Sequence, residues 1–248
     1  MAGTLEDGDI YFLYRPRVGE EQVESADEVQ RLLVVLHPWR KERLRLLIVG
    51  AKRLPRIAEH ERAWCFVDRV VQRPEELREV LGRRTYSTKT RGERTLAPVR
   101  PTGEGAYCIA KHDGHTHLAY ELEIPREPGE PQRALNIEPE ASYVVNVRNP
   151  RTPPPPGAGR PRREAPALPD ELLARLGTRR FAPLDPPDFL DYPGTELVLI
   201  GAAEDASEDL GIDLNAQVES AARRSIFADL LSSRQEHPVE PLFAGVWR

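Results

Sequence analysis

The sequence predicts an α+β protein: an antiparallel, β-rich main body with a few short helices and a smaller C-terminal αβ part. Strand-like runs rich in β-branched and aromatic residues dominate the first two thirds of the 248-residue chain. These runs do not alternate with helical segments, as the strands of a parallel sheet would. A proline-rich stretch then separates them from a last third that has helical and strand patterns of its own.

The spacing of hydrophobic residues and the positions of turn-forming residues predict the individual strands and helices. Strands are expected at 9–15, 31–36, 44–49, 64–71, 142–147 and 195–201, with a β-hairpin over 105–125. Short helices are expected at 74–82 and 169–177, since each has proline and acidic residues at its start and glycine at its end. A helical turn at 26–30 and a longer helix at 216–232 complete the helices. Residues 83–104 lack an apolar period and are predicted to form a long polar loop.

The domain boundaries follow from a change in composition. Residues 150–168 are rich in proline, arginine and glycine and include four consecutive prolines at 153–156. Such a segment is extended and cannot bury a core, so we expect a linker. The chain then divides into a β-rich main domain at 1–149, the linker at 150–168, and a C-terminal αβ part at 169–248 packed on the main body.

Composition excludes some classes of function. Hydrophobic residues make up 40% of the chain and charged residues 30%, which is typical of a globular protein of one or two domains. The net charge of −5 disfavours a nucleic-acid partner. No apolar run approaches the roughly 20 residues that cross a bilayer, and the acidic start lacks the features of a signal peptide. The two cysteines form no disulfide framework, so a soluble, cytoplasmic protein is expected.

A tight turn brings three histidines together. Asp113-Gly114 lies between two alternating apolar runs, which predicts a two-residue type I′ turn. That turn pairs His112 with His115 across the strands and places His117 on the same face. The predicted polar face carries His112, His115, His117, Cys108 and Glu121. The opposite face carries the core residues Tyr107, Ile109, Leu118, Tyr120 and Leu122.

This polar face is a candidate metal site. Three neutral imidazoles with an open coordination position are the pattern of a catalytic zinc or iron centre. His112, His115 and His117 would be the ligands of such a divalent metal, with Glu121 as a possible base. The segment resembles the first cupin motif, in which His-x-His precedes a Glu and then a Gly, here Gly129 after one extra residue. The alternative is a hairpin whose polar face simply contacts water.

The predicted loop at 83–104 is the clearest basic region. It contains six basic residues against two glutamates. Lys89, Arg91 and Arg94 are the candidate ligand-binding residues, because guanidinium groups and hydroxyls bind phosphates and carboxylates. The loop has no phosphate-loop spacing and few aromatic neighbours, which disfavours nucleic acid. A solvated basic loop without a ligand is the alternative.

Residues 8–17, 115–120 and 136–143 also resemble an uncharacterised family of bacterial proteins with no established activity, which implies a bacterial origin. The predicted function is therefore binding of a small anionic ligand or a protein partner, through the 83–104 loop and the neighbouring hairpin. The alternative is a cupin-like, metal-dependent enzyme with its site on the 105–125 hairpin, so catalysis is left open. A sequence-nonspecific nucleic-acid binder is a third, disfavoured class.

Overall fold

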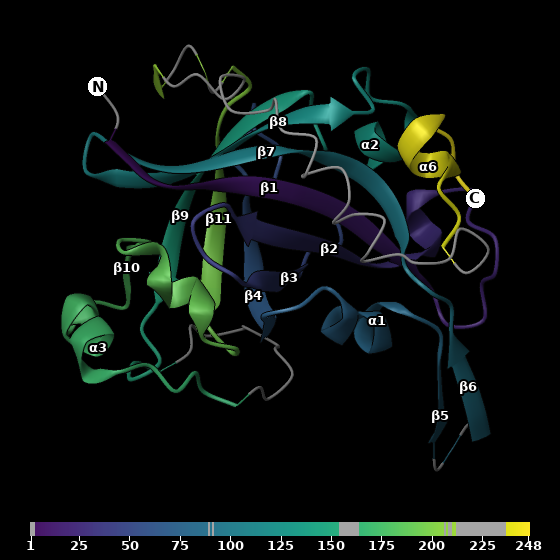
Figure 1. Ribbon diagram of the computed structural model, residues 1–248, viewed down its shortest axis with the longest axis horizontal. Coiled ribbons are helices and arrows are strands. Elements are labelled where there is room, and N and C mark those ends of the chain that lie inside the picture. Colours follow the sequence, from purple (N-terminus) through teal and green to yellow (C-terminus); the bar gives the residue numbers. More distant parts are fainter. Residues whose placement is uncertain are drawn as a thin grey trace.

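An antiparallel β-sheet that closes on itself dominates the computed structural model, which describes residues 3–88, 90, 92–153, 164–205, 207, 210–211 and 237–248. Eight strands follow one another around the barrel in the order β9, β11, β4, β3, β2, β1, β7, β8, and a β8–β9 pairing closes it (Figure 1). Their bounds are β1 Gly3–Pro16, β2 Val29–Pro38, β3 Leu44–Val49, β4 Arg62–Val71, β7 Arg100–His112, β8 His115–Ile124, β9 Glu140–Arg148 and β11 Glu196–Ala203. The short β10 (Phe181–Pro183) adds to the other side of β9.

The antiparallel, β-rich body is confirmed, whereas the α+β class needs correction to a mainly β fold built on a closed barrel. The described helices are short: α1 Glu75–Leu81, α2 Glu130–Ala134, α3 Asp170–Leu176 and α6 Glu240–Phe243, with 3-10 turns at Ala26–Glu28 and Pro187–Asp191. Strand patterns do not reveal closure, because the pairing of two edge strands depends on long-range geometry and not on local sequence. β11 lies between β4 and β9, so the C-terminal part contributes a strand to the barrel.

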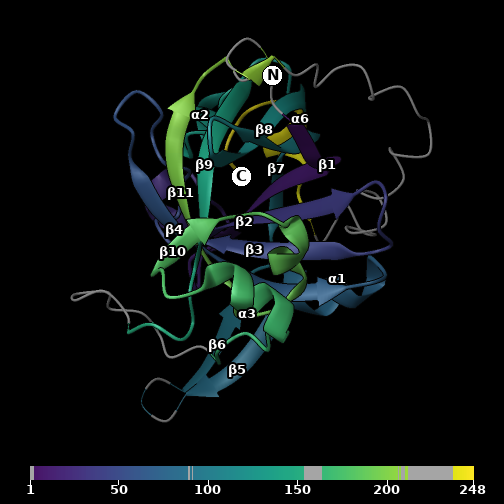
Figure 2. The same cartoon turned by 90° about the vertical axis from the view of Figure 1, so that its left-hand side faces the viewer.

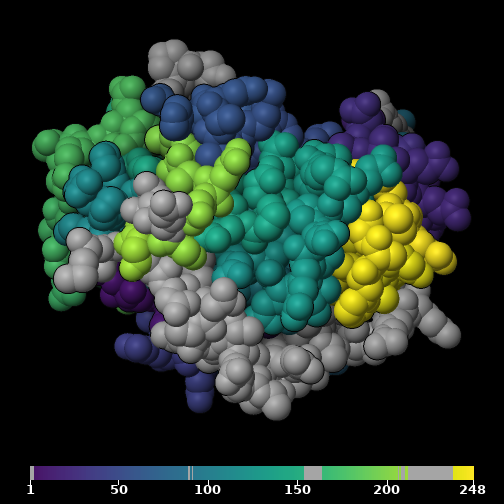
Figure 3. All heavy atoms as spheres, turned by 90° about the horizontal axis from the view of Figure 1, so that it is seen from above, coloured from purple at the N-terminus to yellow at the C-terminus, as the bar shows by residue number. Residues whose placement is uncertain are grey.

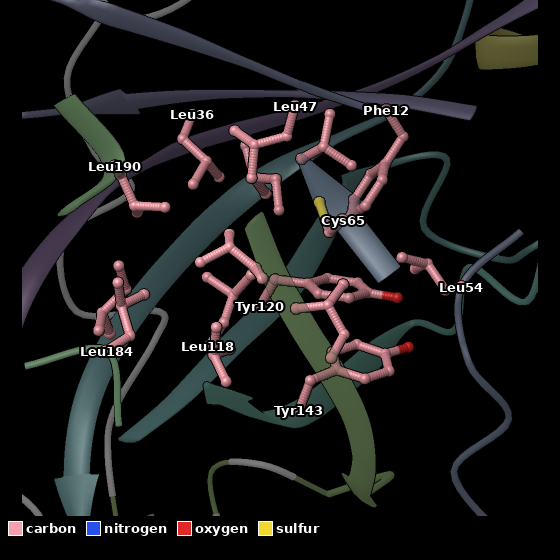
Figure 4. A pocket seen from close by; sticks show the side chains of 16 residues that line it. Phe12, Leu36, Leu47, Leu54, Cys65, Leu118, Tyr120, Tyr143, Leu184 and Leu190 are labelled. Carbon is pink, nitrogen blue, oxygen red and sulfur yellow. The ribbon is translucent and has the colours of Figure 1, made fainter. Parts of the chain in front are cut away.

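Side chains along each strand alternate between the inside and the outside of the barrel, and those that point inward fill its interior. Leu118, Tyr120 and Leu122 of β8 point inward, and so do Ile10 and Phe12 of β1. The ring of Phe12 meets that of Tyr120 edge-on, with 4.9 Å between the ring centroids. Figure 4 shows the apolar side chains that converge from the surrounding strands. The cavity left between them measures about 20 Å³, which is room for about one water molecule.

A second apolar cluster covers the outer face of β1, β2 and β3. Tyr11 and Leu13 of β1 point outward and are buried, because α1 packs Leu77 and Leu81 against this side. Leu77 and Leu81 are four residues apart and so lie on one face of the helix. Leu242 of α6 completes the cluster. Residues 10–14 of β1 form a continuous apolar run because both faces of the strand are buried in this part.

The C-terminal segment is docked on the barrel. Seen from above, residues 237–248 (yellow) lie beside the teal surface of residues near α2 (Figure 3). The Glu130 backbone N–H donates a hydrogen bond to the Gly245 carbonyl at 3.0 Å, and the buried Gln132 side chain donates one to the Pro241 carbonyl at 2.7 Å. The ring of Trp247 meets that of Tyr14 at 5.4 Å between centroids.

The prediction of a long polar loop at 83–104 is wrong. This segment forms a β-hairpin of β5 (Arg84–Thr88) and β6 (Gly92–Leu96), followed by the first residues of β7. Both faces of this hairpin carry mostly polar residues, so the sequence lacks the alternation of apolar and polar residues that marks a half-buried strand. The described residues 150–153 and 164–168 of the predicted linker form neither helix nor strand. The predicted helix at 216–232 and residues 154–163 lie outside the described residues.

Candidate functional site

The histidine hairpin forms with the predicted register. Asp113 and Gly114 have φ angles of 46° and 81°, as the type I′ turn requires. His112 pairs with His115, and Ala110 pairs with His117. The predicted core face is also confirmed, since all five of its residues belong to the buried cluster inside the barrel. The histidine face therefore lies on the outside of the barrel.

The three histidines differ in their surroundings. His117 is buried, and its Nδ1 lies 3.1 Å from the hydroxyl oxygen of Ser142 on β9. His112 is half-buried and lies edge-on to His117, with 6.1 Å between the ring centroids. His115 is exposed at the tip, and Glu121 is half-buried two pairs further along.

Cys108 lies on the same outer face and is buried. Its Sγ is 3.7 Å from the Thr4 hydroxyl, and Leu210 packs against it together with Ala110 and Ala119. Burial raises the pKa of the Cys108 thiol, which favours the neutral form and disfavours a role as nucleophile. The face thus combines small buried residues with imidazoles near the hairpin tip.

Metal binding at this face stays a prediction. No group of three or more His, Cys, Asp or Glu side chains in the described part of the chain is arranged to hold a metal ion. His112 and His117 are the two candidate ligands that contact each other. Metal analysis of the purified, untagged protein is the measurement that decides between a metal site and a solvated hairpin tip.

The β5–β6 hairpin, called here the arm (residues 84–96), is the most exposed secondary structure in the described chain. Figures 1 and 2 show it extending away from the barrel, and its two strands form a sheet of their own. Its four basic residues outnumber its single glutamate. Of the predicted ligand-binding residues, Arg94 lies on β6 and is half-buried, whereas Lys89 and Arg91 lie outside the described residues.

The register of the arm gives it two chemically different faces. Tyr86 lies directly opposite Arg94, and Arg84 lies opposite Leu96. Because cross-strand partners share a face, Arg84, Tyr86 and Arg94 stand on the same side of the arm. Tyr86 exposes 41% of its surface, which is high for a large aromatic side chain. The other face carries Thr85, Ser87, Glu93 and Thr95.

Arg15 anchors the arm at its base. Its guanidinium donates hydrogen bonds to the carbonyls of Val80 and Ala97 at 2.5 Å each, and to those of Leu81 and Gly82 at 3.2 Å. These carbonyls flank the arm on both sides, so one side chain joins its two ends to β1. Burial lowers the pKa of Arg15 to about 10, which reflects the cost of desolvating this cation.

An acidic groove lies on the loop between β1 and β2, next to the base of the arm. It has a volume of about 480 Å³ and is lined by Glu20, Glu21, Gln22, Glu24 and Glu28. Arg83, which precedes the arm, forms a two-pronged ion pair with Glu21, with Nη–Oε distances of 2.7 and 3.0 Å. This bond lowers the pKa of Glu21. The arm and the groove are therefore neighbours of opposite charge.

A buried ionic network occupies one end of the barrel. Arg45 of β3 has no exposed surface, and its guanidinium contacts Glu6 at 2.5 Å and Asp191 at 2.6 Å. Lys41 lies 3.2 Å from Glu6, and the Tyr107 hydroxyl donates a hydrogen bond to Glu6 at 3.0 Å. Burial disfavours the charge of Arg45, but its hydrogen bond to Glu6 and the nearby carboxylates raise its pKa. The charges are balanced, which indicates a structural closure of the barrel end.

Sequence reasoning did not find the network, the acidic groove or the two-faced arm. In the sequence, the buried ionic network was indicated by a single arginine inside the apolar run Leu44–Val49. The groove residues were visible as a glutamate-rich loop, but their position next to the arm depends on the fold.

No protein-family model, curated protein or solved structure matches this chain. None of the helices in the described residues has the length and apolar character needed to cross a membrane. The chemistry of the arm, the groove and the histidine hairpin therefore carries the functional argument.

Proposed function

We propose that this protein is a binding protein that recognises an acidic protein surface through the Arg84–Tyr86–Arg94 face of its arm. The observation that carries the proposal is the placement of an exposed tyrosine between two arginines on one side of an extended ribbon. Tyrosine and arginine dominate the binding energy of protein interfaces, because they combine a large apolar area with directed hydrogen bonds. Guanidinium groups pair with carboxylates in a two-pronged geometry.

A small anionic ligand is the less favoured partner. Small-molecule sites are concave and surround most of the ligand, whereas the arm is a ribbon of two strands that, within the described residues, pair only with each other. The barrel interior cannot serve either, because its cavity of about 20 Å³ holds about one water molecule. An extended partner surface can contact the ribbon without requiring a pocket.

Nucleic acid is disfavoured by the surroundings of the arm. The groove at the base of the arm carries four glutamates, which repel a phosphate backbone. Tyr86 is the one aromatic residue of the arm, whereas single-strand binding depends on several aromatic side chains on which successive bases stack. A protein surface that presents carboxylates near the arm face and basic groups near the groove would match both features.

Replacing both arginines of the arm face tests the proposal. The R84Q/R94Q variant is expected to bind a poly-glutamate peptide at least about tenfold more weakly than the wild type at low salt, because a hot-spot arginine contributes more than about 1 kcal/mol. Tyr86→Ala is expected to weaken binding as well. Fluorescence titration at two salt concentrations measures the loss, and wild-type binding should weaken as salt screens the charges.

Arg73→Gln is the matched control, because Arg73 is exposed and lies outside the arm. It should bind poly-glutamate like the wild type. Equal affinity of wild type and R84Q/R94Q would contradict the proposal. Tighter binding of a single-stranded oligonucleotide than of poly-glutamate, lost in the same variant, would reassign the arm to nucleic acid.

A further inference from the structure

We infer that the acidic protein surface recognised by the arm is the glutamate-lined groove of a second copy of this chain. In this arrangement the arm of each copy lies in the groove of the other, and the two contacts are related by a two-fold axis. The inference rests on the proposed function of the arm and specifies its partner.

Both surfaces hold charges that form no ion pair within the described part of the chain. Arg84 and Arg94 form no ion pair with the described residues. The carboxylates of Glu20 and Glu24 likewise have no ion pair with the described residues, and both side chains are exposed. Two exposed surfaces of opposite charge can pair with each other across two copies.

The chain already pairs an arginine next to the arm with a glutamate of the groove. Arg83, at the root of the arm, holds Glu21 at the edge of the groove through two N–H to O contacts of 2.7 and 3.0 Å. This ion pair brings the root of the arm beside the groove, while the arm itself extends away from the body (Figure 1). Each strand of the arm has five paired residues, which makes the arm about 16 Å long. A second molecule can therefore contact the arm away from the body of the first.

The positions of the arm and the groove also suit a symmetric dimer. A two-fold interface uses the same patch on both copies, so that residue i contacts residue j and j contacts i. A basic arm and an acidic groove that are adjacent on one chain form such a self-complementary patch. Rotation by 180° places the arm of each copy over the groove of the other.

Sedimentation velocity at low salt tests the inference. The wild type is expected to dimerise with rising protein concentration and to dissociate as salt increases, because the contacts are exposed ion pairs. Reversing the charge of the arm in R84E/R94E, or of the groove in E20R/E24R, should each leave a monomer. Thermal melting curves like that of the wild type establish that these variants are folded.

Mixing the two reversed variants is the decisive step. R84E/R94E presents an acidic arm and an acidic groove, whereas E20R/E24R presents a basic arm and a groove in which arginines replace the two glutamates that have no ion pair with the described residues. Each therefore repels itself, but in a mixed pair both arm–groove contacts join opposite charges. The dimer is expected to return only in the mixture. E42R/E79R makes the same change in net charge as E20R/E24R at exposed sites that belong neither to the groove lining nor to the arm, and it should dimerise like the wild type.

The outcomes separate this inference from the proposed function. A wild type that stays monomeric at every soluble concentration, or a dimer that none of the reversals affects, would overturn the inference. Poly-glutamate binding that still depends on Arg84 and Arg94 in such a monomer would leave the proposed function standing. If the wild type neither dimerises nor binds poly-glutamate through Arg84 and Arg94, both the inference and the proposed function are wrong.

Discussion

Replacing Arg45 with methionine is expected to lower the free energy of unfolding by about 3–5 kcal/mol, because it removes one partner of a buried ion pair. Arg45 is fully buried and contacts both Glu6 and Asp191. Methionine fills much of the same volume but leaves two carboxylates at the barrel end without their shared cation. Lys41 lies 3.2 Å from Glu6 and 3.6 Å from Asp191 and supplies partial compensation, so the loss should fall near the lower end of the range. Urea denaturation followed by circular dichroism measures it.

Arg43→Met is the matched control, because Arg43 pairs with the same Asp191 at 2.8 Å but leaves 39% of its side chain exposed. An exposed ion pair contributes about 0–1 kcal/mol, so this variant should lose little stability. If the two substitutions cost the same, the closure of the barrel end does not depend on the buried arginine, and the structural role assigned to the network is wrong.

Arg15→Lys is expected to release the arm. Lysine keeps the buried charge but has a single ammonium group, which cannot reach carbonyls on both sides of the arm. A hydrogen bond from a charged donor contributes about 1.5–3 kcal/mol, so losing two of the four should cost about 3 kcal/mol or more. Amide hydrogen exchange at residues 84–88 and 92–96 should become faster than in the barrel strands, and binding of poly-glutamate should weaken because the arm is no longer held in place.

The comparison variant for Arg15 is Arg17→Lys. Arg17 is exposed two residues further along the chain, so the same substitution there should change stability by less than about 0.5 kcal/mol. Unchanged hydrogen exchange of the arm in Arg15→Lys would mean that other contacts hold its base.

Local sequence signals predicted the local parts of this fold. Asp113-Gly114 determined a turn and, through it, the register of a whole hairpin, since a two-residue loop leaves one pairing. The glycine and proline that bound α1 marked its ends to within about a residue. Barrel closure was not predictable in this way, because it depends on β8 meeting β9 and on β11 entering between β9 and β4.

The candidate sites were predicted in part for the same reason. Composition made Arg94 a candidate binding residue, but its pairing with Tyr86 appears only once the segment is known to be a hairpin. Thr85, Tyr86 and Thr88 are good strand formers, yet no apolar face accompanied them, because water contacts both faces of the arm. The difference between buried His117 and exposed His115 arises from β9, a strand that the hairpin sequence does not include.

Photo-cross-linking from position 86 tests the central claim, that the arm face binds an acidic groove, most directly. Tyr86→p-benzoylphenylalanine places the reactive group on the arginine face, and Thr85→p-benzoylphenylalanine places it on the opposite face as a control. Mixing with an isotope-labelled copy distinguishes cross-links between chains from those within one. Position 86 is expected to cross-link to residues 17–28 of the labelled copy, and position 85 is expected to do so far less. Cross-links from position 86 that stay within its own chain, or that match those from position 85, would contradict this claim.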